Sequence, residues 1–414
     1  MDPSRSTSCD ALLSEVLEQL ERRGESLRRL AAEIHRDPEL GCREYHSAAR
    51  LAGELEEEGF QVVTGLAGMD TAFRAERGRG APAVAFLVEY DAVPEMGHAC
   101  GHNLIAAVSL GAAVALGQVV DRLGGRVVVI GAPAEETVGG KVVLAVRGAL
   151  DDLDAALLAH PGSENCAQVR TVASWSMEVV FEGRASHAVA APERGVDALA
   201  CMVRLLGARD ALLAELGEDF FAPGVILEGG VRPNLVPALA RARFSLRAPS
   251  REALVDRLLP RFRALVESIA ASAGARGRLR AIDNLYDELI SSPLLSRLYR
   301  AQARQEGLEV VERSETLIGS LDTGTVSQRV PVLHPIFSIV DEPVPTHTEA
   351  FTRAAAGPRA LAAAARVTRI LARVGFALLA EPGLLATARR EHADQLRGRP
   401  PRQDVPLITE QDEP

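Results

Sequence analysis

The sequence lacks the marks of a membrane or exported protein. No apolar stretch of about 18 or more residues is free of charge, as a membrane-spanning helix would require. The first residues, Met1 to Ser4, lead into a charged helical pattern without the basic segment, apolar core and small-residue cleavage site of a signal peptide. We therefore expect neither membrane association nor secretion.

Cysteine is scarce and widely scattered. The sequence contains five, an odd number that does not suit a disulfide framework. They are Cys9, Cys42, Cys100, Cys166 and Cys201. A cytoplasmic location, where thiols stay reduced, fits this usage best.

Basic residues are outnumbered. The 46 Lys and Arg residues face 56 Asp and Glu residues, which gives a net charge of -10, and no polybasic stretch occurs. This balance argues against nucleic acid or anionic lipid as a partner. What remains is a globular chain without internal repeats. Its 414 residues, 47% of them hydrophobic, allow two or three domains at roughly 100–200 residues each.

Two apolar runs predict the fold class. Residues Ala83–Val88 and Arg126–Ile130 have the pattern of buried strands, and the alanine-rich segment Leu104–Val120 between them predicts a long apolar helix. This order predicts an α/β domain with a mixed, mostly parallel sheet covered by helices. In such domains, ligands bind beyond the carboxyl ends of the strands.

A second pattern begins near residue 168. Alternating strands such as Ser176–Phe181 and helices such as Arg251–Ala271 predict a smaller α+β domain inserted at 168–283. The larger domain would then be discontinuous, comprising residues 1–167 and 284–390. Residues 391–414 are rich in Arg, Pro, Gln and acidic residues and predict a flexible tail.

The segment His98–His102 contains a thiol and an imidazole two residues apart where a helix is expected to begin. Cys100 and His102 can bind soft or borderline divalent metals, and a helix N-terminus favours the thiolate. A buried structural cysteine beside a histidine is the alternative.

Two adjacent carboxylates follow the second strand. Glu135 and Glu136 would repel one another unless a cation compensates, and in a metal site one can bind the ion while the other moves protons. The alternative is a solvated turn. Asp91 and His160 also lie just beyond predicted strands, although a lone histidine is more often a core or loop residue.

Taken in order, these motifs resemble those of the dinuclear zinc metallopeptidases that include aminoacylases, carboxypeptidase G and succinyl-diaminopimelate desuccinylase. Within that family they resemble the branch of aminobenzoyl-glutamate hydrolase and the aminoacylase-like β-alanyl-lysine dipeptidase. The matching segments are Ile34–Leu40, Glu89–Asn103, Pro133–Glu136, Gly139–Lys141, Gly183–His187, Gly229–Pro237, Phe244–Ser250 and His347–Glu349.

The resemblance implies two divalent ions, zinc above all, with manganese or cobalt as alternatives. Cys100 would bridge them, with His102 and His160 on one ion and Glu136 and His347 on the other. It also implies supporting roles for two acidic residues. Glu135 would be the general base and Asp91 would orient a ligand imidazole.

The inserted domain would be the family's lid and dimerisation domain. His187 would reach the active site of the partner subunit in a homodimer and stabilise the developing oxyanion. Asn234 and Arg247 would contact substrate, and Arg247 is suited to a carboxylate. A structural ion pair is the alternative for Arg247. Residues 319–324 depart from the sequence that related dipeptidases have there, so one wall of the substrate pocket is expected to differ.

The predicted function is hydrolysis of the amide bond of a small dipeptide or N-acyl amino acid. A β-alanyl-lysine type dipeptide is the favoured substrate, and aminobenzoyl-glutamate or another N-acyl amino acid is the alternative. A thiol enzyme with Cys100 as nucleophile would leave Glu136, His160 and His347 without roles. A non-catalytic binding protein would not need the base Glu135.

Overall fold

The structure is a computed structural model that describes residues 3–400 and 405–408. The chain forms two compact units. Among the described residues, unit 1 comprises those up to Arg170, Leu289–Ile318 and Thr325–Arg399, and unit 2 comprises Thr171–Glu288, Gly319–Gly324, Pro400 and 405–408. The short segment 319–324, which the sequence placed in the larger domain, therefore belongs to unit 2.

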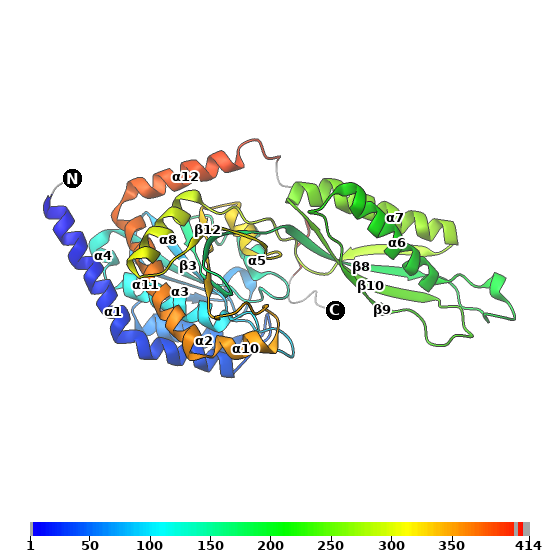
Figure 1. The fold of residues 1–414 in the computed structure, drawn as a ribbon, viewed down its shortest axis with the longest axis horizontal. Coiled ribbons are helices and arrows are strands. Elements are labelled where there is room, and N and C mark those ends of the chain that lie inside the picture. Colours follow the sequence, from blue (N-terminus) through cyan, green and yellow to red (C-terminus); the bar gives the residue numbers. More distant parts are fainter. Residues whose placement is uncertain (1–2, 401–404, 409–414) are drawn as a thin grey trace. The chain divides into compact units, whose positions relative to one another are not determined.

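Unit 1 is built on a six-stranded sheet in the order β1-β2-β4-β3-β5-β13 (Figure 1). The strands are β1 Gln61–Thr64, β2 Phe73–Arg79, β4 Gly125–Gly131, β3 Ala83–Val88, β5 Ala155–Leu157 and β13 Val332–Leu333. The last four are parallel, and β1 and β2 run antiparallel at one side. Every residue of β3 is buried, as expected for a strand covered on both faces. The predicted α/β fold with a mostly parallel sheet is confirmed.

A second sheet of unit 1 has the order β12-β7-β14-β6. Its strands are β12 Val311–Leu317, β7 Cys166–Arg170, β14 Ile336–Ser338 and β6 His160–Gly162. The apolar run from Val332 to Val340 predicts a single strand, but it forms two strands, β13 and β14, which lie in different sheets.

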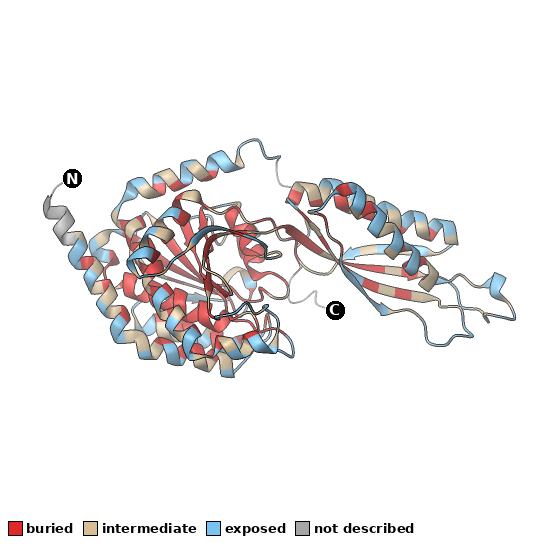
Figure 2. Cartoon of the chain, in the orientation of Figure 1, coloured by how far each residue is buried: buried red, intermediate tan, exposed pale blue. Residues whose placement is uncertain are grey.

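Helices bury the sheet of unit 1. The central one, α3 (His102–Gly117), is apolar all round and every one of its residues is buried (Figure 2). It packs against α1 (Pro3–Arg36) and α11 (Pro358–Ala380). The other helices of this unit are α2 Tyr45–Glu57, α4 Val120–Leu123, α5 Gly140–Val146, α8 Pro293–Gln305, α10 Glu349–Ala355 and α12 Pro382–Leu396. The short helix α9 Thr323–Ser327 begins in the segment assigned to unit 2 and ends in unit 1.

Among the described residues, no single helix is long and apolar enough to cross a membrane. The pair α11 and α12 passes such a test together, but it is bent by 99°. Much of α11 is buried within the core of unit 1, which accounts for its apolar composition.

Unit 2 is a four-stranded antiparallel sheet in the order β11-β8-β10-β9, packed against α6 (Ala198–Leu216) and α7 (Leu259–Ala273) (Figure 1). The strands are β8 Ala173–Glu182, β9 Gly224–Glu228, β10 Leu239–Ala248 and β11 Arg276–Ala281. Alternate residues of β10 are buried, so one face of the sheet meets the helices. The strand β9 lies at the edge of the sheet.

The prediction of a flexible tail at 391–414 is wrong for residues 391–396. Residues 391–396 continue α12, where the buried residues Leu385, Ala388 and His392 recur at helical spacing. The ring of His392 lies 2.7 Å from the carbonyl oxygen of Ser327. Further on, the backbone of Ile408 exchanges two hydrogen bonds with the side chain of Asn284. The polar composition of this segment did not predict the contacts of His392 and Ile408. Residues 401–404 and 409–414 lie outside the described residues.

Candidate metal centre

The predicted metal ligands of unit 1 and the predicted base Glu135 converge at the carboxyl-terminal edge of its parallel strands. They come from the loops that follow β3, β4 and β5 and from the turn before α10. They are Cys100, His102, Glu135, Glu136, His160 and His347. Because parallel strands end at the same edge, residues distant in sequence meet there.

The possible ligand atoms form three groups, in each of which all atoms lie within 4.8 Å of one another. The first joins Cys100, His102 and His160, and the second joins Cys100, Glu136 and His347. The third contains His102, Glu135 and Glu136. The first two groups share Cys100, as a two-ion arrangement with a bridging thiolate would require.

Backbone geometry directs Cys100 and His102 to the same point. Gly101 between them has φ of 78°, and a Cβ there would lie 2.6 Å from Pro161 Cγ. Glycine alone fits this turn, since it adopts the left-handed region freely and leaves room for Pro161. On the other side of the site, His347 has φ of 59°, a conformation that non-glycine residues seldom adopt.

Hydrogen bonds occupy Nδ1 of both His102 and His160 and leave Nε2 of each available to a metal. His102 Nδ1 lies 2.9 Å from a carboxylate oxygen of Asp91, and His160 Nδ1 lies 2.7 Å from the carbonyl oxygen of Pro161. Both Nδ1 atoms therefore donate, and both Nε2 atoms retain a lone pair. His160 Nε2 lies 3.5 Å from Cys100 Sγ, and His347 Nε2 lies 3.1 Å from Glu136 Oε1.

The atoms around His102 suit a cation. Its Nε2 is fully buried and has no hydrogen-bond partner, and it lies 3.5 Å from Glu89 Oε2, which has none either. Glu136 Oε1 is 4.0 Å from the same nitrogen. Buried acceptors that face one another repel unless a positive charge lies between them. The sulfur, nitrogen and oxygen donors of the site match the preferences of zinc.

Burial raises the pKa of the Cys100 thiol, although His102 opposes this effect. A nucleophilic cysteine requires a lowered pKa, so this environment does not favour the alternative of a thiol enzyme. For Glu136, burial acts to raise the pKa, but the hydrogen bond with His347 and the nearby His102 lower it to about 2.

Comparison with known proteins settles the family. The model of peptidase family M20/M25/M40 matches residues 69–373. The chain belongs to this peptidase family. It is 33% identical over 411 residues to the Xaa-Arg dipeptidase of Mus musculus, a match that covers 95% of each chain. The prediction of a metal-dependent hydrolase of this family is confirmed.

Two further matches extend the comparison. A p-aminobenzoyl-glutamate hydrolase chain of Escherichia coli is 33% identical over 241 residues, which cover 53% of this protein and 50% of that one. A dinuclear metal-binding M20 peptidase structure from Bacillus subtilis superposes with a TM-score of 0.66 at 20% identity, covering 86% of this chain and 99% of that one. At this identity the superposition shows a shared fold.

The sequence motifs assigned no role to Lys141 and His334, two buried residues beside the site. Lys141 Nζ lies 2.7 Å from Glu89 Oε1, and both side chains are 1% exposed. Burial acts to raise the pKa of Glu89, but Lys141 and His102 lower it to about 2. His334 is buried, has no hydrogen-bond partner at either ring nitrogen, and stacks on His160 with ring centroids 5.8 Å apart. His334 directly follows β13, so the strand-end rule that selected His160 could have found it.

The other three predicted residues lie in unit 2. His187 is exposed, and its Nδ1 accepts hydrogen bonds from the backbone N–H groups of Val189 and Ala190 at 3.2 and 3.1 Å. Its Nε2 therefore carries the proton and can donate. The backbone carbonyl oxygen of Asn234 accepts the N–H of Ala188 at 3.0 Å. This bond belongs to the antiparallel bridge between His187 and Leu235.

Arg247 is half-buried. Its Nε donates to Ser245 Oγ at 3.0 Å, and burial lowers its pKa while Asp283 opposes this. Among the residues that the structure describes, no carboxylate lies within ion-pair distance of Arg247, so the alternative of a structural ion pair gains no support.

Proposed function

We propose that this M20 chain is a dipeptidase that uses two divalent metal ions and removes a C-terminal basic residue, lysine or arginine, from a small dipeptide. The observation that carries the chemistry is the convergence of five metal-type donors around buried atoms that have no hydrogen-bond partner. The match to a Xaa-Arg dipeptidase along 95% of each chain supports the substrate class, which includes the β-alanyl-lysine type predicted from the sequence.

The ligands are proposed as they were predicted from the sequence. Cys100, His102 and His160 would hold one ion, and Cys100, Glu136 and His347 would hold the other. The close grouping of these donors supports the assignment. Ions held there would supply the positive charge that polarises the scissile carbonyl and makes water a better nucleophile at neutral pH.

The side chains of the protein divide the remaining work. Glu135 is buried beside His102 and Glu136 and is proposed to take the proton of the attacking water and pass it to the leaving amine. Asp91 accepts the Nδ1–H of His102 and so fixes the tautomer in which Nε2 can bind a metal. His187 is proposed to donate its Nε2–H to the oxyanion, and Arg247 to bind the substrate carboxylate with its planar guanidinium.

We also propose that unit 2 mediates a homodimer. The edge strand β9 exposes Val225, Ile226 and Leu227, and Val203 on α6 is exposed too. An open edge with apolar side chains favours pairing with a second strand. Ile226→Lys should convert the dimer into a monomer in analytical ultracentrifugation, and a dimer that persists would place the interface elsewhere.

The alternative substrate is aminobenzoyl-glutamate or another N-acyl amino acid. The partial match to the Escherichia coli hydrolase favours it over other amides. The two substrates differ in the charge of the released amino acid, so one assay can separate them.

The decisive experiment measures metal content and hydrolysis together. Purified protein is assayed with β-alanyl-lysine, dipeptides ending in Arg, Leu or Glu, aminobenzoyl-glutamate and N-acetyl amino acids, before and after chelation and after addition of zinc, manganese or cobalt. Two ions per chain and metal-restored cleavage that is fastest for Lys and Arg are expected. Fastest release of glutamate would support the alternative, and chelator-resistant hydrolysis would overturn the site.

A further inference from the structure

The loop that carries Glu135 has an unfavourable backbone conformation. Ala134, directly before it, has φ of 60°, in the left-handed region that residues with a Cβ seldom adopt. Such a conformation persists only where surrounding contacts impose it.

Two buried carboxylates hold the backbone on both sides of Glu135. Glu44 Oε1 accepts the N–H of Ala134 at 2.7 Å, and Asp91 Oδ2 accepts the N–H of Glu136 at 2.9 Å. Hydrogen bonds to carboxylates are short and strong, above all away from water. The peptide group before Ala134 and the peptide group after Glu135 are therefore both fixed.

Glu44 does not serve its own helix. It occupies the residue before α2 but makes no side-chain hydrogen bond to that helix. The carboxylate of Glu39 accepts the N–H groups of His46 and Ser47 there, at 2.9 and 2.8 Å. The role of capping α2 thus falls to Glu39, and Glu44 is directed inward.

Further contacts fix the side chain and backbone around Glu44. It is 0% exposed, and its Oε2 accepts from Thr71 Oγ1 at 2.8 Å. Nearby, the backbone of Gly41 lies so close to the loop that an added Cβ would sit 3.0 Å from Ala134 Cα. The segment around Gly41 and Glu44 is therefore packed directly against the Ala134 loop.

We propose that Glu44 is a positioning residue that holds Ala134 in its left-handed conformation and so aims Glu135 at the reacting atoms. The inference rests on the proposed function, in which Glu135 is the base. The backbone N–H of Ala134 needs only an oxygen acceptor from residue 44. Glutamine should therefore replace Glu44, since its carbonyl can accept from Ala134.

The test compares three variants. Glu44→Ala should lower kcat roughly 10- to 100-fold with KM and metal content near those of the wild type, because a small displacement of a catalytic group is costly. E44Q should keep kcat within about threefold of the wild type on the same argument. Adding Ala134→Gly to E44A should restore part of kcat, because glycine adopts the left-handed conformation without the steric cost that alanine has.

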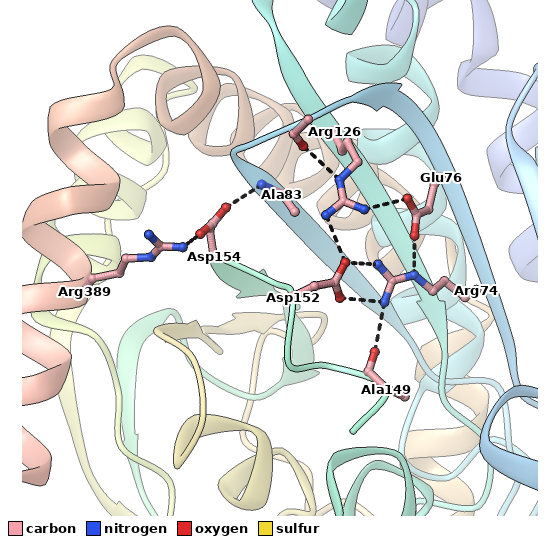
Figure 3. Close-up of polar contacts among 9 residues, drawn as sticks. Arg74, Glu76, Ala83, Arg126, Ala149, Asp152, Asp154 and Arg389 are labelled. Carbon is pink, nitrogen blue, oxygen red and sulfur yellow. Dashed lines mark hydrogen bonds and ion pairs between the residues drawn. The ribbon is translucent and has the colours of Figure 1, made fainter. Parts of the chain in front are cut away.

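A matched control comes from the opposite edge of the same sheet. Asp154 is buried and accepts the N–H of Ala83 at 2.6 Å, so it also binds a strand-end backbone group with a carboxylate, and it pairs with Arg389 (Figure 3). Asp154→Ala should lower thermal stability and leave kcat unchanged. Hydrogen exchange of the peptide spanning 131–138 should be faster in E44A and unchanged in D154A, whatever the activity.

The outcomes separate the two proposals. If the wild type shows no chelator-sensitive hydrolysis, or if Glu135→Gln retains kcat, the proposed function fails. If both hold but E44A keeps its kcat, or loses it only in proportion to lost metal, the inference on Glu44 is wrong. Equal losses of kcat in E44A and D154A would also overturn it. If E44A does not fold, Glu44→Met, which fills the volume without an acceptor, takes its place with the same expected results.

Discussion

The two edges of the unit 1 sheet, where its parallel strands begin and end, differ in how fully their charged and polar side chains are paired. At the amino-terminal edge of β3, β4 and β5, Arg126 donates to Glu76, to Asp152 and to the carbonyl oxygen of Gly80, each at 2.9 Å (Figure 3). Arg74, which lies on β2 opposite Ile130, also binds Asp152 through two nitrogens at 3.0 and 2.8 Å. These charges are paired. At the carboxyl-terminal edge, buried atoms of His102, Glu89 and His334 have no partner.

Backbone geometry follows the same division. The residues with left-handed φ at the amino-terminal edge are glycines, for example Gly78 and Gly125, for which the conformation is inexpensive. At the metal edge, Ala134 and His347 adopt it without that advantage. The amino-terminal edge has paired charges and inexpensive backbone conformations, which favour stability. The carboxyl-terminal edge has buried atoms without hydrogen-bond partners and strained backbone, which a bound cation and substrate can use. The following changes test this contrast, from the largest expected effect to the smallest.

Glu135→Gln should lower kcat roughly 10²- to 10⁴-fold, the usual contribution of a general base. Metal content should stay unchanged, because Glu136 and the other donors remain. Steady-state kinetics and elemental analysis of the same sample provide the measurement. Asp152→Asn, the same chemical change at the opposite edge, is the control and should keep its kcat. Comparable losses in both variants would mean that the edges do not differ in function.

Lys141→Met should destabilise the protein by about 3–5 kcal/mol, because it leaves the buried Glu89 carboxylate without its cation. Urea unfolding of the metal-free protein measures this effect. The double variant with Glu89→Leu removes both charges and should recover most of the loss. A K141M protein as stable as the wild type would show that the ion pair is not a structural element of the metal edge.

Zinc should stabilise the chelated protein by about 2.7 kcal/mol per site at a free concentration of 100 times Kd, since it binds the folded state. Thermal unfolding at increasing zinc concentrations measures the gain. His102→Ala should remove most of it, whereas D152N should show the same gain as the wild type. An unchanged gain in H102A would place the ion elsewhere.

Asp152→Asn should cost only about 0.5–1 kcal/mol at pH 7, because the Asp152 side chain is 47% exposed and water screens the pairs. Burial acts to raise the pKa of Asp152, but the guanidinium groups of Arg74 and Arg126 lower it below its ordinary 3.8. The contribution is therefore complete above about pH 4 and is lost as the pH falls through the lowered value. Urea unfolding of both proteins at pH 7 and pH 3 should show the difference shrinking. A constant difference would exclude ionisation of Asp152 as its cause.

The sequence predicted the parallel sheet from local signals, because apolar runs identify β3 and β4. Glu135 and His160 were candidates because they follow predicted strands, whereas His347 and the full ligand set came from the resemblance to a known family. Contacts made across long distances in sequence left no such signal. Glu44 and Ala134 are 90 residues apart, and nothing near either one indicates their hydrogen bond.

Composition misled the prediction in two places. The polar residues around His392 suggested a tail, although helical spacing buries one face of α12. The run from Val332 to Val340 looked like one strand, although it changes sheets at His334 and Pro335. In both cases the pattern of burial, rather than the average polarity, determined the structure.

The order of the donors along the chain bears on biosynthesis. Cys100 emerges from the ribosome early, but His347 follows only after all of Thr171–Glu288, the main segment of unit 2, has been made. Domains generally fold as units during synthesis, and unit 2 interrupts unit 1. A nascent chain can therefore fold the inserted sheet first, and it cannot assemble the full set of donors until His347 has been made. The connectivity of the fold thus delays hydrolase activity until both sides of the metal centre have been made.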